Sequence, residues 1–184
     1  MKPGVRALGI AESYRSDSST LAGVVCRASR VVDGFVFGSC TVGGTDATAA
    51  VIELFDRLDR EDLQYVFLAG VAPAWYNVLD LSAVHGATDR PVIAVSFEDS
   101  DGLEPAIREA FDGDAAESRL EVYRSLPDRE AVSVGEDRLY VRSVGLDEDA
   151  GEVVRAFTPE GGRPEPLRVA RLAARAADRE RAVD

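Results

Sequence analysis

The first quarter of the chain has the pattern of apolar and polar residues that is typical of β-strands. Three segments rich in valine and phenylalanine are separated by short turns that contain serine. Connections this short favour antiparallel neighbours. The pattern therefore predicts a three-stranded antiparallel meander over residues 5–12, 21–27 and 31–38.

The rest of the chain switches between helical and strand-like patterns. After the Gly43-Gly44 break, apolar residues recur at helical spacing over residues 45–58, with Thr45 or Asp46 as the predicted N-cap. The continuous apolar runs YVFLAGVA and PVIAVSF have the composition of buried strands. The other predicted elements are helices over 77–86, 103–111, 147–157 and 165–181, and a strand pair at 131–134 and 138–143.

This order of elements, a meander followed by alternating helices and strands, predicts an α/β fold with one mixed sheet flanked by helices. The ribonuclease H-like architecture has this plan, and in it the first and fourth strands are neighbours. Acidic residues on these strands and on nearby helices then meet at one edge of the sheet. At 184 residues the chain is expected to form a single domain over 1–184, with its last few residues disordered.

The composition adds a strong acidic bias to this picture. The net charge is −12, Lys2 is the only lysine, and the acidic residues are spread along the whole chain. We interpret this dispersed charge as adaptation to high salt, as in a halophile. In molar salt the Debye length falls to about 3 Å, so the acidity does not argue against a DNA partner.

Several classes of protein are disfavoured. No apolar run approaches the roughly 18–20 residues that span a bilayer, and the N-terminus lacks a signal-peptide profile, so we expect no membrane association. Cys26 and Cys40 lack metal-site spacing and are predicted to be small core residues of a protein in the reducing cytoplasm. The only histidine, His85, is predicted to lie at a helix end, which disfavours zinc chemistry and a His-paired nucleophile.

Three carboxylates remain as candidates for chemistry. Glu12 ends the first strand, Asp46 starts the first long helix, and Asp80 follows the fourth strand. Carboxylates of this kind hold Mg²⁺, which can activate water and stabilise the charge that builds up on a phosphodiester. Each acid also has a structural interpretation: Asp46 as an N-cap, Asp80 as a solvated helix residue, and Glu12 as the partner of Arg15 or Arg168.

Several stretches resemble the archaeal endonuclease V homologues known as endonuclease dU. They are VRALGIAESY, VFLAGVAPAWYNVLDL, PVIAVSF and GGRPEPLRVARLAAR, and the resemblance extends over nearly the whole chain. It implies a ribonuclease H-like fold and a metal-dependent endonuclease that acts on DNA with deaminated bases, deoxyuridine in particular. Ala69 stands where endonuclease V has its third acid, and Phe97 stands where it has a lysine.

The resemblance implies roles for individual residues. Glu12 and Asp46 are expected to bind Mg²⁺ or Mn²⁺, and Asp80 is expected to assist catalysis or to orient water. The expected substrate-binding residues come from the glycine turn, the loop after the fourth strand and the last helix, and are Gly43, Gly44, Gly70, Trp75, Tyr76, Asn77 and Arg168.

The residues themselves leave alternatives open. Trp75 and Tyr76 could stack on an extruded base or pack in the core. Arg168 and Arg171 could face the phosphate backbone or brace acids. Two other functions compete with the endonuclease: a non-catalytic nucleic-acid- or protein-binding module, favoured by Ala69, and an enzyme that holds a small phosphorylated ligand at Gly43–Asp46.

Overall fold

The predicted meander is present and its strands are longer than the sequence pattern indicates. A computed structural model describes residues 1–181. In it, β1 (Arg6–Tyr14), β2 (Ser18–Arg27) and β3 (Val32–Thr41) pair antiparallel in sequence order. The expected disorder of the last few residues concerns positions 182–184, which lie outside the described residues.

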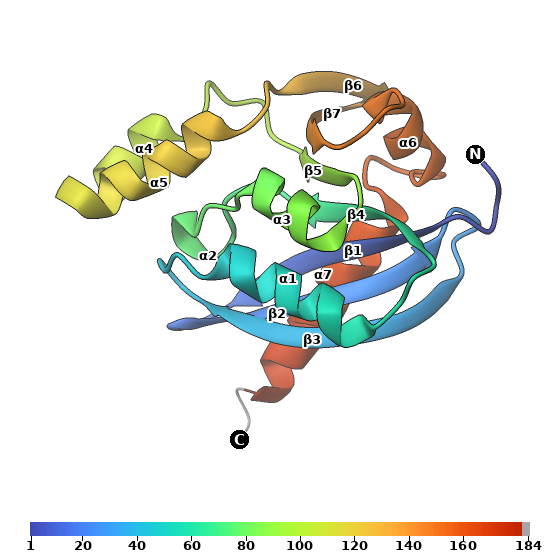
Figure 1. Cartoon of the computed structure of the whole chain (residues 1–184), viewed down its shortest axis with the longest axis horizontal. Helices are drawn as coiled ribbons and strands as arrows, with labels where there is room; N and C mark the ends of the chain where they lie inside the picture. The colour runs from blue at the N-terminus through green and yellow to red at the C-terminus, as the bar shows by residue number, and fades with distance from the viewer. Residues whose placement is uncertain (182–184) are drawn as a thin grey trace.

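The meander forms three strands of a seven-stranded mixed sheet with strand order β3-β2-β1-β4-β5-β7-β6 (Figure 1). β1 pairs in parallel with β4, and β4 pairs in parallel with β5, whereas β7 joins antiparallel to β5 and to β6. The later strands are β4 (Leu63–Ala69), β5 (Val92–Ser96), β6 (Glu130–Val134) and β7 (Asp137–Val144). The predicted mixed sheet and the adjacency of the first and fourth strands are confirmed.

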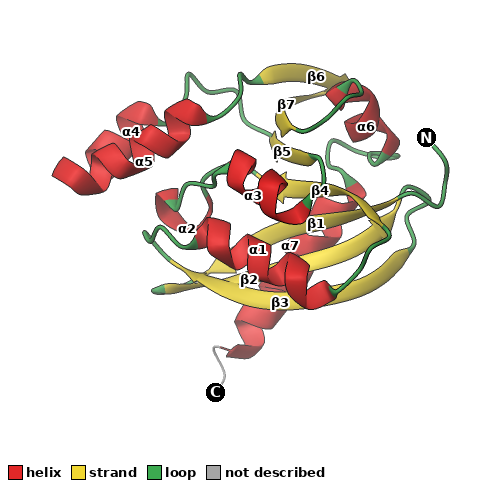
Figure 2. Cartoon of the chain, in the orientation of Figure 1, coloured by secondary structure: helices red, strands yellow, loops and turns green. Residues whose placement is uncertain are grey.

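Helices cover both faces of this sheet (Figure 2). They are α1 (Ala47–Leu58), α2 (Pro73–Tyr76), α3 (Leu81–Thr88), α4 (Glu104–Ala110), α5 (Gly113–Ser125), α6 (Ala150–Ala156) and α7 (Glu165–Arg181). Helices α1 and α3 pack on one face, against side chains such as Leu8 and Leu68. Helices α6 and α7 pack on the other face, against side chains such as Phe67 and Val95.

The structure differs from the predicted helices in two places. The sequence pattern does not predict helix α5, because its inward-facing stripe contains Arg119 between the buried residues Ala116 and Leu120, which breaks the apolar pattern. The helix predicted over 77–86 begins only at Leu81, since Asp80 caps it and residues 73–76 form a separate short turn. Both cysteines are buried and unpaired, as predicted.

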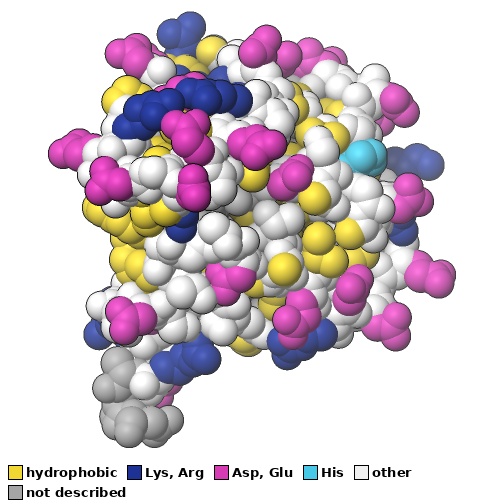
Figure 3. All heavy atoms as spheres, turned by 60° about the vertical axis from the view of Figure 1, so that its left-hand side comes forward, with side chains coloured by type: hydrophobic (Ala, Val, Ile, Leu, Met, Phe, Trp, Pro, Cys, Tyr) yellow, Lys and Arg dark blue, Asp and Glu magenta, His cyan; other side chains and the backbone are white. Residues whose placement is uncertain are grey.

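The acidic residues are dispersed over the surface, as they are along the sequence. Acidic side chains are scattered over the face that Figure 3 shows and do not gather in one block. No helix within residues 1–181 is long and apolar enough to cross a membrane.

Helix α7 packs closely on β1 because β1 has a glycine at the point of contact. A Cβ atom on Gly9 would lie 2.4 Å from the backbone carbon of Pro166 in α7.

We expect Gly9→Ala to force α7 away from the sheet and to lower the free energy of unfolding by about 3 kcal/mol. Urea denaturation checks this value. Gly86→Ala is the matched control, because a Cβ at Gly86 meets no atom within 4 Å. The control should be neutral or slightly stabilising, and equal losses in the two variants would contradict the packing argument.

Candidate functional site at the carboxyl edge of the sheet

The carboxyl ends of β1, β4 and β5 lie at the same edge of the sheet because these three strands run parallel to one another. Functional sites in open α/β sheets commonly form at this edge. Glu12 near the end of β1, Ala69 at the end of β4 and Phe97 just after β5 all lie here. The chain turns away from β4 at Gly70, whose φ of +86° favours glycine.

Glu12 is held by a neighbouring strand and not by an arginine. The Ser19 hydroxyl on β2 donates to Glu12 Oε2 at 2.6 Å. The two arginines considered as partners pair elsewhere, Arg15 with Asp178 at 3.1 Å and Arg168 with Glu165 at 2.7 Å. Glu12 lies over the α1 face of the sheet, with Ile10, Leu21 and Ala69 beside it.

Asp46 ties three segments of the chain together. Its Oδ1 accepts from the Thr41 backbone N–H at 3.0 Å and from Asn77 Nδ2 at 2.7 Å. Its Oδ2 accepts from the Thr41 hydroxyl at 2.8 Å and from the same Thr41 N–H at 3.1 Å. Burial alone would raise the pKa of Asp46, but the hydrogen bonds from Asn77 and Thr41 outweigh it and lower the pKa below its usual value.

Glu12 and Asp46 both lie close enough to Cys40 for their charges to affect its pKa. Burial, together with the charges of Asp46 and Glu12, raises the pKa of the Cys40 thiol to about 12. Both carboxylates therefore lie near the end of β3. Asp80 has a different role, because its Oδ1 accepts from the Ala83 N–H at 2.9 Å and caps α3.

The three carboxylates do not form the ion-binding group that the resemblance implies. Across residues 1–181, no three Asp, Glu, His or Cys side chains come together in an arrangement that could hold a metal ion. A carboxylate has about four lone-pair positions, and three donors already approach those of Asp46, with the Thr41 N–H shared between its two oxygens. Ala69 contributes no ligand at the end of β4. The residues present therefore do not fit a divalent ion bound jointly by Glu12 and Asp46.

The loop after β4 contains an unusual backbone turn. Ala74, Trp75 and Tyr76 follow one another with φ values of 49°, 60° and 56°, in the left-handed region that residues with a Cβ rarely adopt. The Ala74 carbonyl accepts from the Gly43 N–H at 2.7 Å, and the Asn77 side chain donates to the Thr41 carbonyl at 2.9 Å. These bonds hold the strained turn against the Gly43-Gly44 turn.

The two aromatic residues of this turn face different surroundings. Tyr76 packs against the buried side chains Val78, Ile107 and Leu120, which agrees with the core-packing interpretation. Trp75 is 52% exposed, and its ring lies 5.2 Å from that of Tyr76. Strain of this kind is commonly found at functional sites, and Trp75 is the residue of the pair whose ring is open to solvent.

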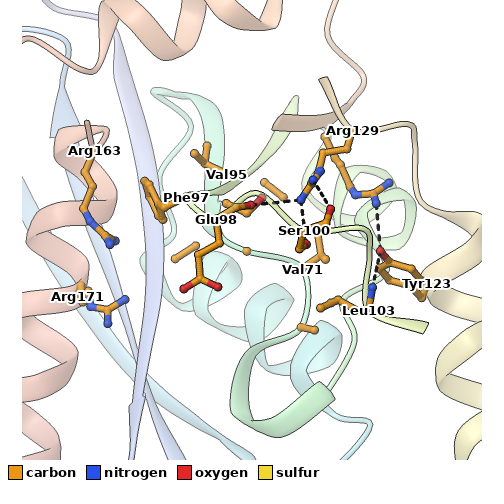
Figure 4. A pocket seen from close by; sticks show the side chains of 16 residues that line it. Val71, Val95, Phe97, Glu98, Ser100, Leu103, Tyr123, Arg129, Arg163 and Arg171 are labelled. Carbon is orange, nitrogen blue, oxygen red and sulfur yellow. Dashed lines mark hydrogen bonds between the residues drawn. The ribbon is translucent and has the colours of Figure 1, made fainter. Parts of the chain in front are cut away.

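A cavity of about 430 Å³ opens at the same edge, between the loops that follow β4 and β5 (Figure 4). It is lined by the four arginines Arg129, Arg142, Arg163 and Arg171, by one acid, Glu98, and by Ala69–Ala72, Phe97 and other apolar and small residues. Arg163 stacks on Phe97, with its guanidinium carbon 3.9 Å from the ring centroid. The cavity has the size of a small-ligand site and carries an excess of positive charge.

Sequence reasoning missed most of these arginines. It named Arg171 as an alternative but placed Arg168 in the site, and Arg168 is paired with Glu165 outside the cavity. It also missed Arg119, a side chain only 6% exposed that donates to the Gly44 carbonyl at 3.0 Å and to the Gly43 carbonyl. For Arg163, the signal available in the sequence was its isolated position after Gly161-Gly162.

Comparison with solved structures defines the class of fold. Endonuclease V from Ciona intestinalis, in complex with inosine-containing DNA, superposes with a TM-score of 0.62 at 14% identity, over 96% of this chain and 86% of that chain. Endonuclease V from Streptomyces avermitilis gives 0.64 at 20% identity, over 98% and 84%. A protein from Archaeoglobus fulgidus gives 0.82 at 26% identity, over 94% and 98%. The chain has an endonuclease V-like fold.

Sequence comparison defines the family. Residues 3–178 match the profile of the family described as Endonuclease dU. A UPF0215 protein of Thermococcus kodakarensis is 37% identical over 96% of this chain and 93% of its own length. A relative from Pyrobaculum calidifontis is 36% identical over 91% and 93%. The chain belongs to the Endonuclease dU family, and this membership together with the fold points to a nuclease.

The hydrogen bonds of Asn77 predict a large effect of its removal. Asn77 is fully buried and also accepts from the Ala47 N–H at 2.9 Å. We expect Asn77→Ala to leave buried polar groups unpaired and to lower the free energy of unfolding by about 3 kcal/mol in urea denaturation. The control, Ser82→Ala on the exposed start of α3, should change it by less than about 0.5 kcal/mol.

The same variant has a second readout, in its pH dependence. A carboxylate with a lowered pKa adds stability above its unfolded pKa, and this stability is lost as the pH falls through the folded value. Asp46 therefore stabilises the wild type above about pH 4, close to the unfolded pKa of aspartate. Without the Asn77 hydrogen bond this contribution shrinks, so Asn77→Ala should lose less stability than the wild type between pH 5 and pH 2. Parallel pH profiles would contradict the assigned network.

Proposed function

We propose that this protein is an endonuclease that nicks DNA at or near deaminated bases, with deoxyuridine as the preferred lesion. The observation that carries the proposal is the exposed Trp75 on its strained turn, in the loop that also lines the arginine-rich cavity. Enzymes that act on single bases take the base out of the stack and hold it against aromatic side chains. Family membership and the fold support this choice of chemistry.

Trp75 acts in this proposal as a stacking surface for an unpaired base. The hydrogen bonds from Gly43 and Asn77 fix the turn before DNA arrives, so little ordering is needed on binding. The exposed ring lies beside Gly43, where a Cβ would come within 3.6 Å of the indole. The Gly43-Gly44 turn has no side chains, so its backbone can approach a DNA strand closely beside the ring.

Glu12 is the proposed catalytic carboxylate. It lies at the carboxyl edge with one oxygen bonded to Ser19, and a positioned carboxylate can orient water or accept its proton. The Mg²⁺ or Mn²⁺ dependence expected from the resemblance stays a prediction, and an ion held jointly by Glu12 and Asp46 is no part of this proposal. Asp46 and Asp80 have structural hydrogen bonds in the site, so their proposed contribution is to hold its loops in place.

A second function is favoured by a specific observation. Hydrogen bonds occupy Asp46, and Ala69 contributes no carboxylate at the end of β4. A module that binds nucleic acid without cutting it would keep the arginine cavity and the Trp75 turn but would not need a complete acidic site.

Cleavage assays separate the two functions. We expect the purified protein with Mg²⁺ or Mn²⁺ to nick uracil-containing duplexes in low or high salt, and hypoxanthine-containing duplexes less well. Glu12→Gln should lower the rate at least about 100-fold, because it removes a carboxylate that acts on the reacting atoms. Asp17→Asn, on the exposed turn after β1, is the control and should match the wild type. If neither lesion is nicked under any condition while DNA is still bound, the binding module is the correct function.

The role of Trp75 is tested separately. Trp75→Ala should weaken binding of a uracil-containing oligonucleotide about tenfold, because stacking on an aromatic ring contributes about 1–3 kcal/mol per base. Trp75→Tyr should restore most of the affinity. Leu172→Ala, another exposed apolar residue, is the matched control for loss of surface area. Fluorescence anisotropy gives the affinities, and equal values for all four proteins would remove Trp75 from the site.

A further inference from the structure

The two arginines contributed by α7 and the segment before it have no partner for their charge. Across residues 1–181, neither Arg163 nor Arg171 has an ion pair or a hydrogen bond, and Figure 4 shows their guanidinium groups close together on one wall of the cavity. Arg163 packs on the Phe97 ring at 3.9 Å. A guanidinium stacked in this way keeps the N–H groups on its edge available for a planar, bidentate acceptor.

The other two arginines of the cavity are already engaged. Arg129 donates to the Ser100 carbonyl at 2.6 Å and stacks on Tyr140 at 4.3 Å. Arg142 donates to the Pro127 carbonyl and to the Tyr123 hydroxyl, the latter at 3.4 Å. These bonds fix the loop after β5 and the start of β6. The available donors of the cavity therefore belong to Arg163 and Arg171.

The electrostatics indicate an anion at this wall. Burial lowers the pKa of Arg163, and the charges of Arg171 and Arg175 lower it further. Three like charges are thus gathered in a chain whose net charge is −12 and whose other arginines mostly pair with acids. Like charges gathered at one place create a positive potential that attracts an anion. Glu98 projects into the same cavity, but it forms no ion pair with either arginine in the described part of the chain.

We propose that Arg163 and Arg171, with Phe97 as the supporting platform, bind a phosphate group of the substrate directly and without a divalent ion between protein and phosphate. The inference rests on the proposed function for its substrate, a nucleic-acid strand. The Glu98 carboxylate repels an anion from its own side, so the phosphate lies against α7, and the nucleoside extends toward Ala69–Ala72. The occupied lone pairs of Asp46 agree with this, because they leave phosphate neutralisation to the guanidinium groups.

The test is a binding experiment on the full chain in EDTA. A fluorescent oligonucleotide with one deoxyuridine is titrated with wild type, with the double variant Arg163→Gln/Arg171→Gln, and with the control Arg179→Gln. Arg179 is exposed on the same helix, about 12 Å further along its axis than Arg171. A fourth protein, Arg163→Lys/Arg171→Lys, keeps the charge but removes the bidentate geometry. Melting temperatures confirm that all four proteins are folded.

We expect the wild type and Arg179→Gln to bind in EDTA with equal affinity, and the double glutamine variant to bind at least tenfold more weakly. Its plot of log affinity against log salt should be flatter by roughly 0.7–0.9, because the contact to one phosphate is lost. The lysine variant should recover the salt slope but only part of the affinity. Wild-type affinity in the double glutamine variant, or loss of all binding in EDTA, would overturn the inference.

A second arm separates the sources of the phosphate. Isothermal titration with dUMP and with inorganic phosphate measures whether the site takes a free phosphate monoester or needs a strand. Tight binding of inorganic phosphate alone, with no gain from the oligonucleotide, would overturn the nucleic-acid assignment. The proposed nuclease activity fails independently of this arm: DNA that is bound through the two arginines but never cut contradicts only the endonuclease, whereas DNA that is cut normally by the double variant contradicts only the phosphate site.

Discussion

The hydrogen-bond network of Asp46, Asn77 and Thr41 is the constraint on which the arrangement of the site depends. It joins the end of β3 and the start of α1, which are close in the sequence, to Asn77 in the loop after β4, 31 residues beyond Asp46. A buried amide such as Asn77 must satisfy its donors and acceptors within the protein, and this requirement fixes the path of each segment. Trp75 lies on that path, in the left-handed turn that leads to the buried residue Val78.

The same network changes what an acid at this edge can do. In an ion site, a carboxylate needs lone pairs that face the ion. Here the N–H and hydroxyl of Thr41 and the amide of Asn77 bind to those of Asp46, so its charge stabilises the loops instead. The positive charge of the edge comes from another layer of the fold, the segment around Arg163 and the flank of α7. The cavity at this edge, where the sequence predicts acids, is therefore lined mainly by guanidinium groups.

Arginine has two distinct roles in this acidic chain. Most arginines neutralise nearby carboxylates on the surface, as Arg124 does with Glu104 at 2.7 Å. A few are drawn inward and bind backbone carbonyls, as Arg119 does at the Gly43-Gly44 turn. A guanidinium can serve both roles because it remains charged when partly buried and has five donors in one plane.

The sequence by itself determined the meander, the adjacency of β1 and β4, the last helix and the family, because these follow from local periodicity and from motifs that are contiguous in the chain. It also indicated Glu12, Asp46 and Trp75 as residues of the carboxyl edge. Only the tertiary structure showed which contacts these residues make. Whether the Asp46 oxygens are free or hydrogen-bonded depends on Asn77, thirty-one residues away. Whether Arg163 or Arg168 faces the cavity depends on how the segment before α7 packs on the sheet. Such facts depend on distances between segments far apart in the chain, which local patterns do not encode.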